Sequence, residues 1–378
     1  FGGRGPENHA LSDTLAFDGS ACMDITPATA PEPRERGALA FDSQRGQIVM
    51  FGGWDGSGGA ESLSAALTWR FDEEGWLGAA LPGSPPRVTG HSMAYDPLRD
   101  RVVLFGGGTE PPPSSPDPGQ VVMSARTFEY DGAAWAEVFP SHAPQARSNH
   151  RLVFDTSLGK VLLFGGVQGM DPQSGAFGDT WIFDGADWTE LNPIHSPPAR
   201  SWFMLAHDET RQETLVHGGI SDEVTALTDT WVFDGTDWVE RHPVNAPSWR
   251  AAAAVGFDPL RKRVVLYGGL FLSGYLDDVW EWDGIDWTRA YSLPPPARGM
   301  VEMVYHRGLR QMVLFGGYNG QPFGDTWFYR YASQWPDEDC KNGVDDDGDG
   351  DVDCADPDCE GQGCPGGGSC AGGVCVTP

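Results

Sequence analysis

The residues whose spacing best fits a built site lie near the C-terminus, where aspartates recur at alternate positions. From Asp345 to Asp356 the sequence reads DDDGDGDVDCAD. Aspartates at positions 1, 3, 5, 9 and 12, with Gly350 at position 6, match the ligand spacing of a twelve-residue calcium loop. Position 7 would contribute its backbone carbonyl. The sequence therefore predicts a calcium site formed by Asp345, Asp347, Asp349, Asp351, Asp353 and Asp356.

Two features separate this segment from a helix–loop–helix calcium site. Position 12 is Asp356 instead of glutamate, and the flanks are rich in Cys, Gly and Pro. The segment resembles the Asp-rich calcium repeats of extracellular proteins such as thrombospondin type 3, and short Cys-rich modules of secreted myxobacterial proteins. The alternative is a disordered acidic linker. Because Cys340 and Cys354 bracket the acidic run, we favour a module whose folding is linked to calcium binding.

Cysteine is concentrated in the same region. One of the seven cysteines, Cys22, lies before residue 340, and the others are Cys340, Cys354, Cys359, Cys364, Cys370 and Cys375. Six cysteines in a short polar segment indicate a disulfide-rich module, and therefore an oxidising compartment. They allow fifteen pairings, which the sequence leaves open. We expect a secreted or cell-surface protein.

Arginines recur with a long, regular period, and each is expected to begin an inner strand. They form a possible ring on one face of the molecule: Arg36, Arg87, Arg147, Arg200, Arg250 and Arg298. Guanidinium groups in such a ring could bind carboxylated or sulfated glycans. The structural alternative pairs each arginine with an aspartate of the same period (Asp13, Asp179, Asp229, Asp278 and Asp325). The periodicity favours the structural alternative, because ligand sites are normally asymmetric.

The elements that position these residues come from an internal repeat. An apolar run ending in an aromatic residue or His and two glycines recurs every 48 to 59 residues, at positions 1, 51, 105, 164, 217, 267 and 315. Nine residues before the last six of these positions stands a turn residue, an aspartate in five repeats and His306 in the last. A second hairpin follows each glycine pair, as in DTWIFDGADW (179–188). Each repeat therefore predicts four antiparallel strands.

A repeat of about 50 residues with four strands, a Gly-Gly pair and a downstream Trp resembles the kelch repeat of β-propellers. The resemblance covers residues 1–335 and implies an all-β, kelch-type β-propeller, with residues 336–378 as a small disulfide-rich module. Seven second hairpins can be counted, the first at 13–22, but only six complete first hairpins. We therefore expect seven blades, the first lacking its inner strands in this sequence, with six blades as the alternative.

This architecture assigns the loops to two faces. Short turns within the hairpins lie on one face, and long insertions between the hairpins lie on the other, as at 108–124 and 167–178. Because function on scaffolds of this kind concentrates in variable loops, the second face is the candidate binding surface. Cys22 stands where the other copies have Trp, which favours a buried thiol over a disulfide or a reactive group.

Catalysis receives little support from the sequence. The resemblance to propellers of the galactose oxidase type would require two histidines and two tyrosines around copper. His91 and His150 do share one strand position in neighbouring repeats, whereas His217 replaces a core aromatic residue. No serine-hydrolase motif is present. The sequence therefore favours a protein without catalytic activity over an enzyme, and we expect no organic cofactor.

Charge and hydropathy limit the partners. The formal net charge of -29 argues against a nucleic-acid partner, and no apolar run is long enough to span a membrane. We expect a non-catalytic recognition protein that binds an extracellular protein or a glycan. The alternatives are a carbohydrate-active copper oxidase and a structural subunit that self-assembles into a surface assembly or filament.

Overall fold

The structure is a computed structural model of the 378-residue chain. It describes residues 30–329, apart from 56–62, 73, 112–113, 116, 118–119, 222, 224, 273 and 291–294, together with five short strands outside that range. Contacts divide the chain into one unit of residues 1–329 and another of residues 330–378. The predicted domain boundary at residue 335 lies outside the described residues.

The first three repeats form three antiparallel sheets, each ordered from the inner to the outer strand. We call them sheets 1, 2 and 3. Sheet 1 contains β3 (Ala38–Asp42), β4 (Gln47–Phe51), β5 (Thr68–Asp72) and β6 (Gly75–Ala79); sheet 2 contains β8 (Ser92–Asp96), β9 (Arg101–Phe105), β12 (Thr127–Tyr130) and β13 (Trp135–Val138); sheet 3 contains β14 (Arg151–Asp155), β15 (Lys160–Phe164), β16 (Thr180–Phe183) and β17 (Trp188–Leu191).

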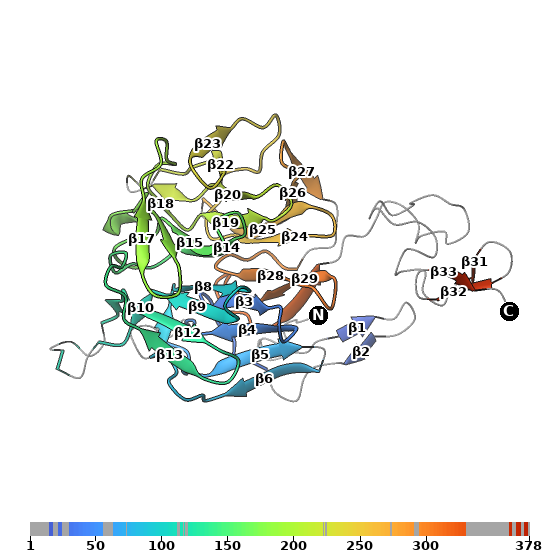
Figure 1. Ribbon diagram of the computed structural model, residues 1–378, viewed down its shortest axis with the longest axis horizontal. Helices are drawn as coiled ribbons and strands as arrows, with labels where there is room; N and C mark the ends of the chain where they lie inside the picture. The colour runs from blue at the N-terminus through green and yellow to red at the C-terminus, as the bar shows by residue number, and fades with distance from the viewer. Residues whose placement is uncertain are drawn as a thin grey trace. The chain divides into compact units, whose positions relative to one another are not determined.

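The next three repeats form sheets 4, 5 and 6 in the same order. Sheet 4 contains β19 (Met204–Asp208), β20 (Glu213–His217), β22 (Thr230–Phe233) and β23 (Trp238–Arg241); sheet 5 contains β24 (Ala254–Asp258), β25 (Arg263–Phe271), β26 (Gly274–Trp282) and β27 (Trp287–Ala290); sheet 6 contains β28 (Glu302–His306), β29 (Gln311–Phe315) and β30 (Thr326–Tyr329). Figure 1 shows these sheets around a common axis, with the first strand of each innermost. This is a β-propeller.

Short elements complete the described chain. Strands β7 (Val88–Thr89), β10 (Gly108–Thr109), β11 (Val122–Met123), β18 (Arg200–Ser201) and β21 (Ile220–Ser221) and the 3-10 helix η2 (Pro172–Ser174) lie in the connections; β1 (Leu15–Phe17) pairs with β2 (Cys22–Asp24), and β31 (Gly363–Cys364), β32 (Gly368–Ala371) and β33 (Val374–Val376) form a separate sheet. In that sheet Cys370 lies opposite Cys375.

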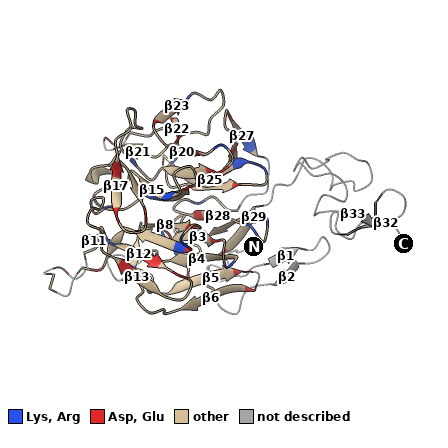
Figure 2. Ribbon diagram, in the orientation of Figure 1, with Lys and Arg blue, Asp and Glu red and all other residues tan. Residues whose placement is uncertain are grey.

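Figure 2 shows acidic and basic positions interspersed over the propeller strands.

The ring closes after six sheets. Inner strand β28 contacts both β24 and β3, so the last sheet meets the first. The Arg34 amide donates to the Phe323 carbonyl at 2.9 Å, and the Gly317 amide donates to the Arg34 carbonyl at 3.0 Å. Among the described residues, six sheets thus form the ring, and backbone hydrogen bonds join the sixth sheet to the first.

The predicted hairpin turns have a simple chemical basis. At the end of each inner strand in sheets 2 to 5, the aspartate carboxylate accepts hydrogen bonds from backbone amides two and three residues later, as Asp96 does from Leu98 (3.0 Å) and Arg99 (3.1 Å). Such side-chain bonds stabilise tight turns. In sheet 6, Nδ1 of His306 accepts from the Leu309 amide at 3.0 Å. The exceptional residue thus performs the same task as the aspartates.

Buried tryptophans connect five of the six sheets to the preceding one. The indole N–H of the first Trp in an outer strand donates to a threonine hydroxyl at the start of the third strand of the sheet before it, at 2.8 to 3.3 Å. The donor–acceptor pairs are Trp76–Thr326, Trp135–Thr68, Trp188–Thr127, Trp238–Thr180 and Trp287–Thr230. The first pair joins sheet 1 to sheet 6. We call these bonds the Trp–Thr interlock.

Removing one acceptor should weaken the ring. We predict that Thr180→Val, which keeps the side-chain shape but leaves the buried Trp238 N–H unpaired, lowers the free energy of unfolding by about 1–3 kcal/mol. Urea unfolding followed by tryptophan fluorescence measures this change. The matched control is Thr189→Val, because Thr189 is exposed on β17.

A double variant separates the hydrogen bond from packing. In a chain that already carries Trp238→Phe, the donor is absent, so Thr180→Val should cost much less. An equal cost in both backgrounds would show that the Thr180 hydroxyl does not act through Trp238.

Candidate functional site

The centre of the loop-bearing face is a closed ring of six residues, one from each sheet. All six have a positive φ, between 52° and 62°. Each amide donates to the carbonyl of the equivalent residue in the preceding sheet, at 2.7 to 3.4 Å, and the last bond returns to the first residue. We call this ring the collar: Arg36, Gly90, Asn149, Trp202, Ala252 and Met300.

The collar is conformationally demanding. A left-handed conformation costs a non-glycine residue roughly 1–2 kcal/mol, and five of the six collar residues are not glycine. The conformation persists because each amide and carbonyl is used in the ring. Backbone strain that is held in place by its surroundings is a frequent property of functional sites.

The side chains of the collar differ from sheet to sheet, although the backbone is repeated. The Arg36 guanidinium lies 5.6 Å from the centre of the Trp202 ring, which comes from the opposite side of the mouth. Arg36 Nε also lies 3.4 Å from Met300 Sδ and 3.4 Å from a carboxylate oxygen of Glu35. The mouth therefore combines a cation, an aromatic face and an amide, from Asn149.

Glu35 is a second unusual group at this mouth. Its side chain is buried, and Oε2 has no hydrogen-bond partner among the described residues. Burial raises the pKa of the Glu35 carboxyl, and the Arg36 charge acts in the opposite direction. The equivalent positions in other sheets hold small residues, such as Ser148 and Ala251. Glu35 is thus a local departure from the repeat that adds an acceptor beside the collar.

Aromatic side chains extend this surface over sheets 4 to 6. Strands β25 and β26 continue past the sheet as a hairpin that ends at Leu272, whose side chain is 75% exposed. Tyr275 of this hairpin contacts Tyr318 edge to face, with ring centres 6.2 Å apart. Trp249 lies against Phe271 at 5.6 Å. Each of these rings is partly exposed and could contact a ligand.

The periodic arginines have a different environment. Four of them are fully buried, and each forms two hydrogen bonds of 2.5 to 3.0 Å with an aspartate of its own sheet, two residues before a tryptophan of the third strand. The pairs are Arg147–Asp179, Arg200–Asp229, Arg250–Asp278 and Arg298–Asp325. The aspartate also accepts from a Trp indole two residues later. Such saturated pairs hold the blade together and present no free guanidinium to a ligand.

Electrostatics agree with a structural pairing. Burial alone would raise the pKa of Asp229, but the hydrogen bonds and charge of Arg200 outweigh it, so the pKa lies below its usual value. The same holds for Asp278 beside Arg250. The carboxylates therefore stay charged, and each buried guanidinium keeps its counter-ion.

Two predicted ring members lie in other positions. In sheet 1 the periodic place belongs to Arg34, whose Nη1 donates to the Gly52 carbonyl at 3.1 Å, as Arg147 does to Gly165 at 2.9 Å. Arg36 is two residues further on, in the collar. Arg87 precedes the periodic position, which Val88 fills, and contacts Leu63 and Glu110. The short motif of each repeat did not distinguish these neighbouring places.

The paired histidines pack as aromatic residues. His150 lies edge-on to Phe105 with ring centres 5.4 Å apart, the distance at which Phe203 meets Phe164 one sheet later. A Cβ on Gly106 would lie 2.8 Å from the His150 ring, which explains the glycine at this close approach. Burial lowers the pKa of His91 to about 3 and that of His150 well below its usual value. Both rings are therefore neutral. His217 lies in the core against Trp287, as predicted.

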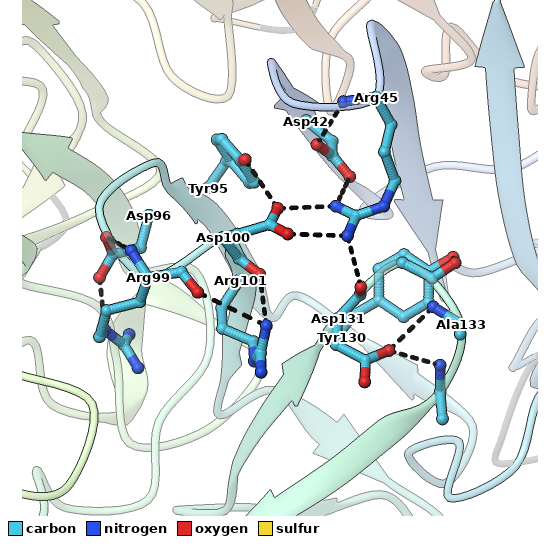
Figure 3. A network of polar contacts seen from close by, with 12 residues as sticks. Asp42, Arg45, Tyr95, Asp96, Arg99, Asp100, Arg101, Tyr130, Asp131 and Ala133 are labelled. Carbon is cyan, nitrogen blue, oxygen red and sulfur yellow. Dashed lines mark hydrogen bonds and ion pairs between the residues drawn. The ribbon is translucent and has the colours of Figure 1, made fainter.

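The opposite face is formed by the hairpin turns and carries ionic networks. Figure 3 shows Arg45 of sheet 1 bonded to Asp42 (2.8 Å) and to both oxygens of Asp100 (2.7 and 2.8 Å) in sheet 2. Arg45 also donates to the Asp131 carbonyl at 2.6 Å, and the Tyr95 hydroxyl donates to Asp100 at 2.9 Å. This network joins the turns of neighbouring sheets.

Other predicted site residues lie outside the described side chains. These are the calcium-loop aspartates (345, 347, 349, 351, 353 and 356), the six C-terminal cysteines, Cys22 and Asp13. Within the described part of the chain, no group of three or more His, Cys, Asp or Glu residues could hold a metal ion. In the same part, no helix is long and apolar enough to cross a membrane.

Comparison with known proteins supports the fold. No family model matches the chain. It is similar to human multiple epidermal growth factor-like domains protein 8, with 29% identity over 177 residues, covering 44% of this chain and 6% of that protein. The chain thus spans a small fraction of that relative. A solved structure described as "Structure of YjhT" has a TM-score of 0.62 and 16% identity, covering 81% of this chain and 97% of that one. That likeness shows the β-propeller fold.

The buried histidines predict a measurable acid sensitivity. The unfolded chain protonates His150 below about pH 6.5, but the folded chain does so only at much lower pH, so stability is present above pH 6.5 and is lost as the pH falls below it. We predict that His150→Phe reduces this loss, by up to about 1.4 kcal/mol for each pH unit below 6.5.

Free energies of unfolding measured from pH 7.5 to 4.5 test the prediction. The matched control, His242→Phe, changes an exposed histidine and should retain the wild-type slope. Parallel curves for wild type and His150→Phe would contradict the assignment.

Proposed function

We propose that this chain is a non-catalytic extracellular recognition protein whose loop-bearing face binds a protein or a glycan. The observation that carries the proposal is the contrast within the collar. Its backbone conformation repeats six times, whereas the side chains at these equivalent positions differ in type and include Arg36, Asn149, Trp202 and Met300. The scaffold accounts for the repeated backbone, and recognition of a specific ligand would account for the different group in each place.

The chemistry of the surrounding surface supports recognition. Aromatic residues, Met and Arg are the residues enriched in binding surfaces, because they offer large contact areas and directional polar contacts. Trp202 and Arg36 occupy the centre of the face, and Tyr275 and Tyr318 extend it. Glu35 adds an acceptor that has no partner within the described residues. A ligand with both donor and acceptor groups beside a flat apolar part would use all of these groups.

The extracellular setting is supported from outside the propeller. The C-terminal cysteine cluster is typical of disulfide-rich modules of secreted proteins. The human relative is described by its epidermal growth factor-like domains, and small domains of that name are typical of extracellular chains. We further infer a kelch-type ring of six blades, on the basis of the repeat and of the collar.

We also propose that residues 336–378 form a calcium-stabilised module. The support is the spacing of the six aspartates and their position among cysteines. The register of β32 and β33 sets Cys370 opposite Cys375, a backbone arrangement that suits a disulfide. In this proposal the module serves as a spacer or docking element that follows the propeller in the chain.

Substitution at the collar should test recognition. We predict that a ligand found by glycan array or by pull-down from extracellular material binds Trp202→Ala at least tenfold more weakly, because a central aromatic anchor is removed. The comparison variant is Leu98→Ala, at a 73% exposed position on the turn face, which should bind as wild type does. Thermal unfolding confirms that both variants are folded. Loss of binding in Leu98→Ala with retention in Trp202→Ala would place recognition on the other face.

Calcium should stabilise the C-terminal module. We predict that titration of the oxidised full-length chain releases or absorbs heat with one calcium per chain at millimolar concentrations or below. The double variant Asp347→Asn and Asp349→Asn should lose this signal, because two carboxylate ligands are neutralised. The matched variant Asp234→Asn and Asp283→Asn changes two propeller turn residues and should retain it. An unchanged signal in the first variant would reject the loop as the site.

A further inference from the structure

A large cavity runs along the propeller axis beneath the collar. Its volume is about 540 Å³, and all six inner strands line it. One end lies at Ser92, Arg151 and Glu302, just beneath the collar. The other end lies among the hairpin turns at Ser43, Thr156 and Arg307. We call this cavity the channel.

The collar end of the channel is closed. Six collar hydrogen bonds surround the axis there, and Arg36 lies against Trp202 across it. Beneath them Arg151 of sheet 3 donates to Glu302 of sheet 6 at 2.5 Å, so an ion pair spans the channel between opposite sheets. The space between the collar and this ion pair is about 30 Å³, enough for about one water molecule. The channel therefore ends beneath the collar. Its other end lies among the turns, where Arg307 of sheet 6 forms an ion pair of 2.8 Å with Glu209 of sheet 4.

Small residues keep the channel wide. The middle of the inner strand is alanine or glycine in four sheets, at Ala40, Ala94, Ala206 and Gly256. Nearer the turns, an aromatic residue lines the channel in five of the six sheets: Phe41, Tyr95, Phe154, Phe257 and Tyr305. The walls thus combine flat apolar surfaces with polar groups at both ends: Arg151 and Glu302 beneath the collar, and Thr156, His207, Glu209 and Arg307 among the turns. Small-molecule pockets of 300–1,000 Å³ have a similar mixture.

We propose that the channel is a second binding site, separate from the loop-bearing face. Its ligand is an uncharged small molecule with a flat or aliphatic body and a hydroxyl or amide group at one end. Arg151 can donate to this group and Glu302 can accept from it, while the two remain paired with each other. A charged end would compete with one partner and leave the other partly buried charge uncompensated, which is unfavourable.

The chemistry of the ligand can be tested on the full chain with Nile red, an uncharged fluorescent probe. We expect saturable binding of one Nile red per chain. Among competitors of equal length, 1-octanol should displace it at concentrations at least tenfold lower than octanoate or octylammonium. Unsaturable binding, or displacement by a charged competitor as effective as octanol, would overturn the proposal.

The direction of access can be tested with a bulky maleimide attached at either end. Ser43 is exposed at the end of the channel that lies among the turns, so modified Ser43→Cys should bind at least tenfold less Nile red. Modified Leu272→Cys carries the same group on the loop-bearing face and should bind as wild type treated with the reagent does. Blocking by the Leu272 label, or none by the Ser43 label, would show that the probe does not enter as proposed.

Discussion

The collar is the constraint on which the rest of the propeller depends. Its six backbone hydrogen bonds run in one direction around the axis, each donated to the preceding sheet, and the last returns to the first. This closed circuit fixes the distance of every inner strand from the axis. It also holds five non-glycine residues in a left-handed conformation that they would leave if the circuit opened. Closure, the number of sheets and the position of the mouth therefore have a common cause.

Two sets of residues surround this circuit, and they differ in their periodicity. Buried Arg–Asp pairs and the Trp–Thr interlock recur around the ring because each sheet has the same neighbours to hold. At the mouth, Arg36, Trp202 and Glu35 occur once each, and they leave polar groups and aromatic faces available. The protein thus separates the residues that build the ring from those that give one face its chemical character.

Much of this fold could be predicted from the sequence. The glycine pair, the turn aspartates and the alternating hairpins indicate four-stranded repeats because each feature acts over a few residues. The ion pair between Arg200 and Asp229 could also be predicted, because arginines and aspartates recur with the same period along the sequence. The number of blades could not be predicted in this way, because it depends on which sheet the strand after Arg34 meets. For the same reason Arg36 was grouped with the periodic arginines, although Arg34 fills the periodic position and Arg36 lies in the collar.

The candidate site was less accessible to sequence reasoning. Asn149 and Trp202 come together only when the ring closes, and no short motif marks them. Variation along the sequence does not single them out either, because the residues beside each collar position also differ from repeat to repeat, as His150 and Phe203 do. The two histidines next to the collar suggested a metal site. However, Phe203 occupies the equivalent position in the next sheet and packs as His150 does, so the packing of a ring accounts for His150 without a metal. The channel depends on strands from all six sheets, which sequence patterns treat one at a time.

The Trp–Thr interlock also shows that the boundaries between sheets are not all alike. A sheet that carries both a Trp donor and a Thr acceptor can form this hydrogen bond with a neighbour on each side. Sheet 5 departs from this rule, because Val279 stands where the other sheets have the threonine acceptor. The boundary between sheets 5 and 6 therefore lacks the threonine acceptor. Apolar packing takes its place there, because Val279 lies in one buried cluster with Met303 and Leu314 of sheet 6.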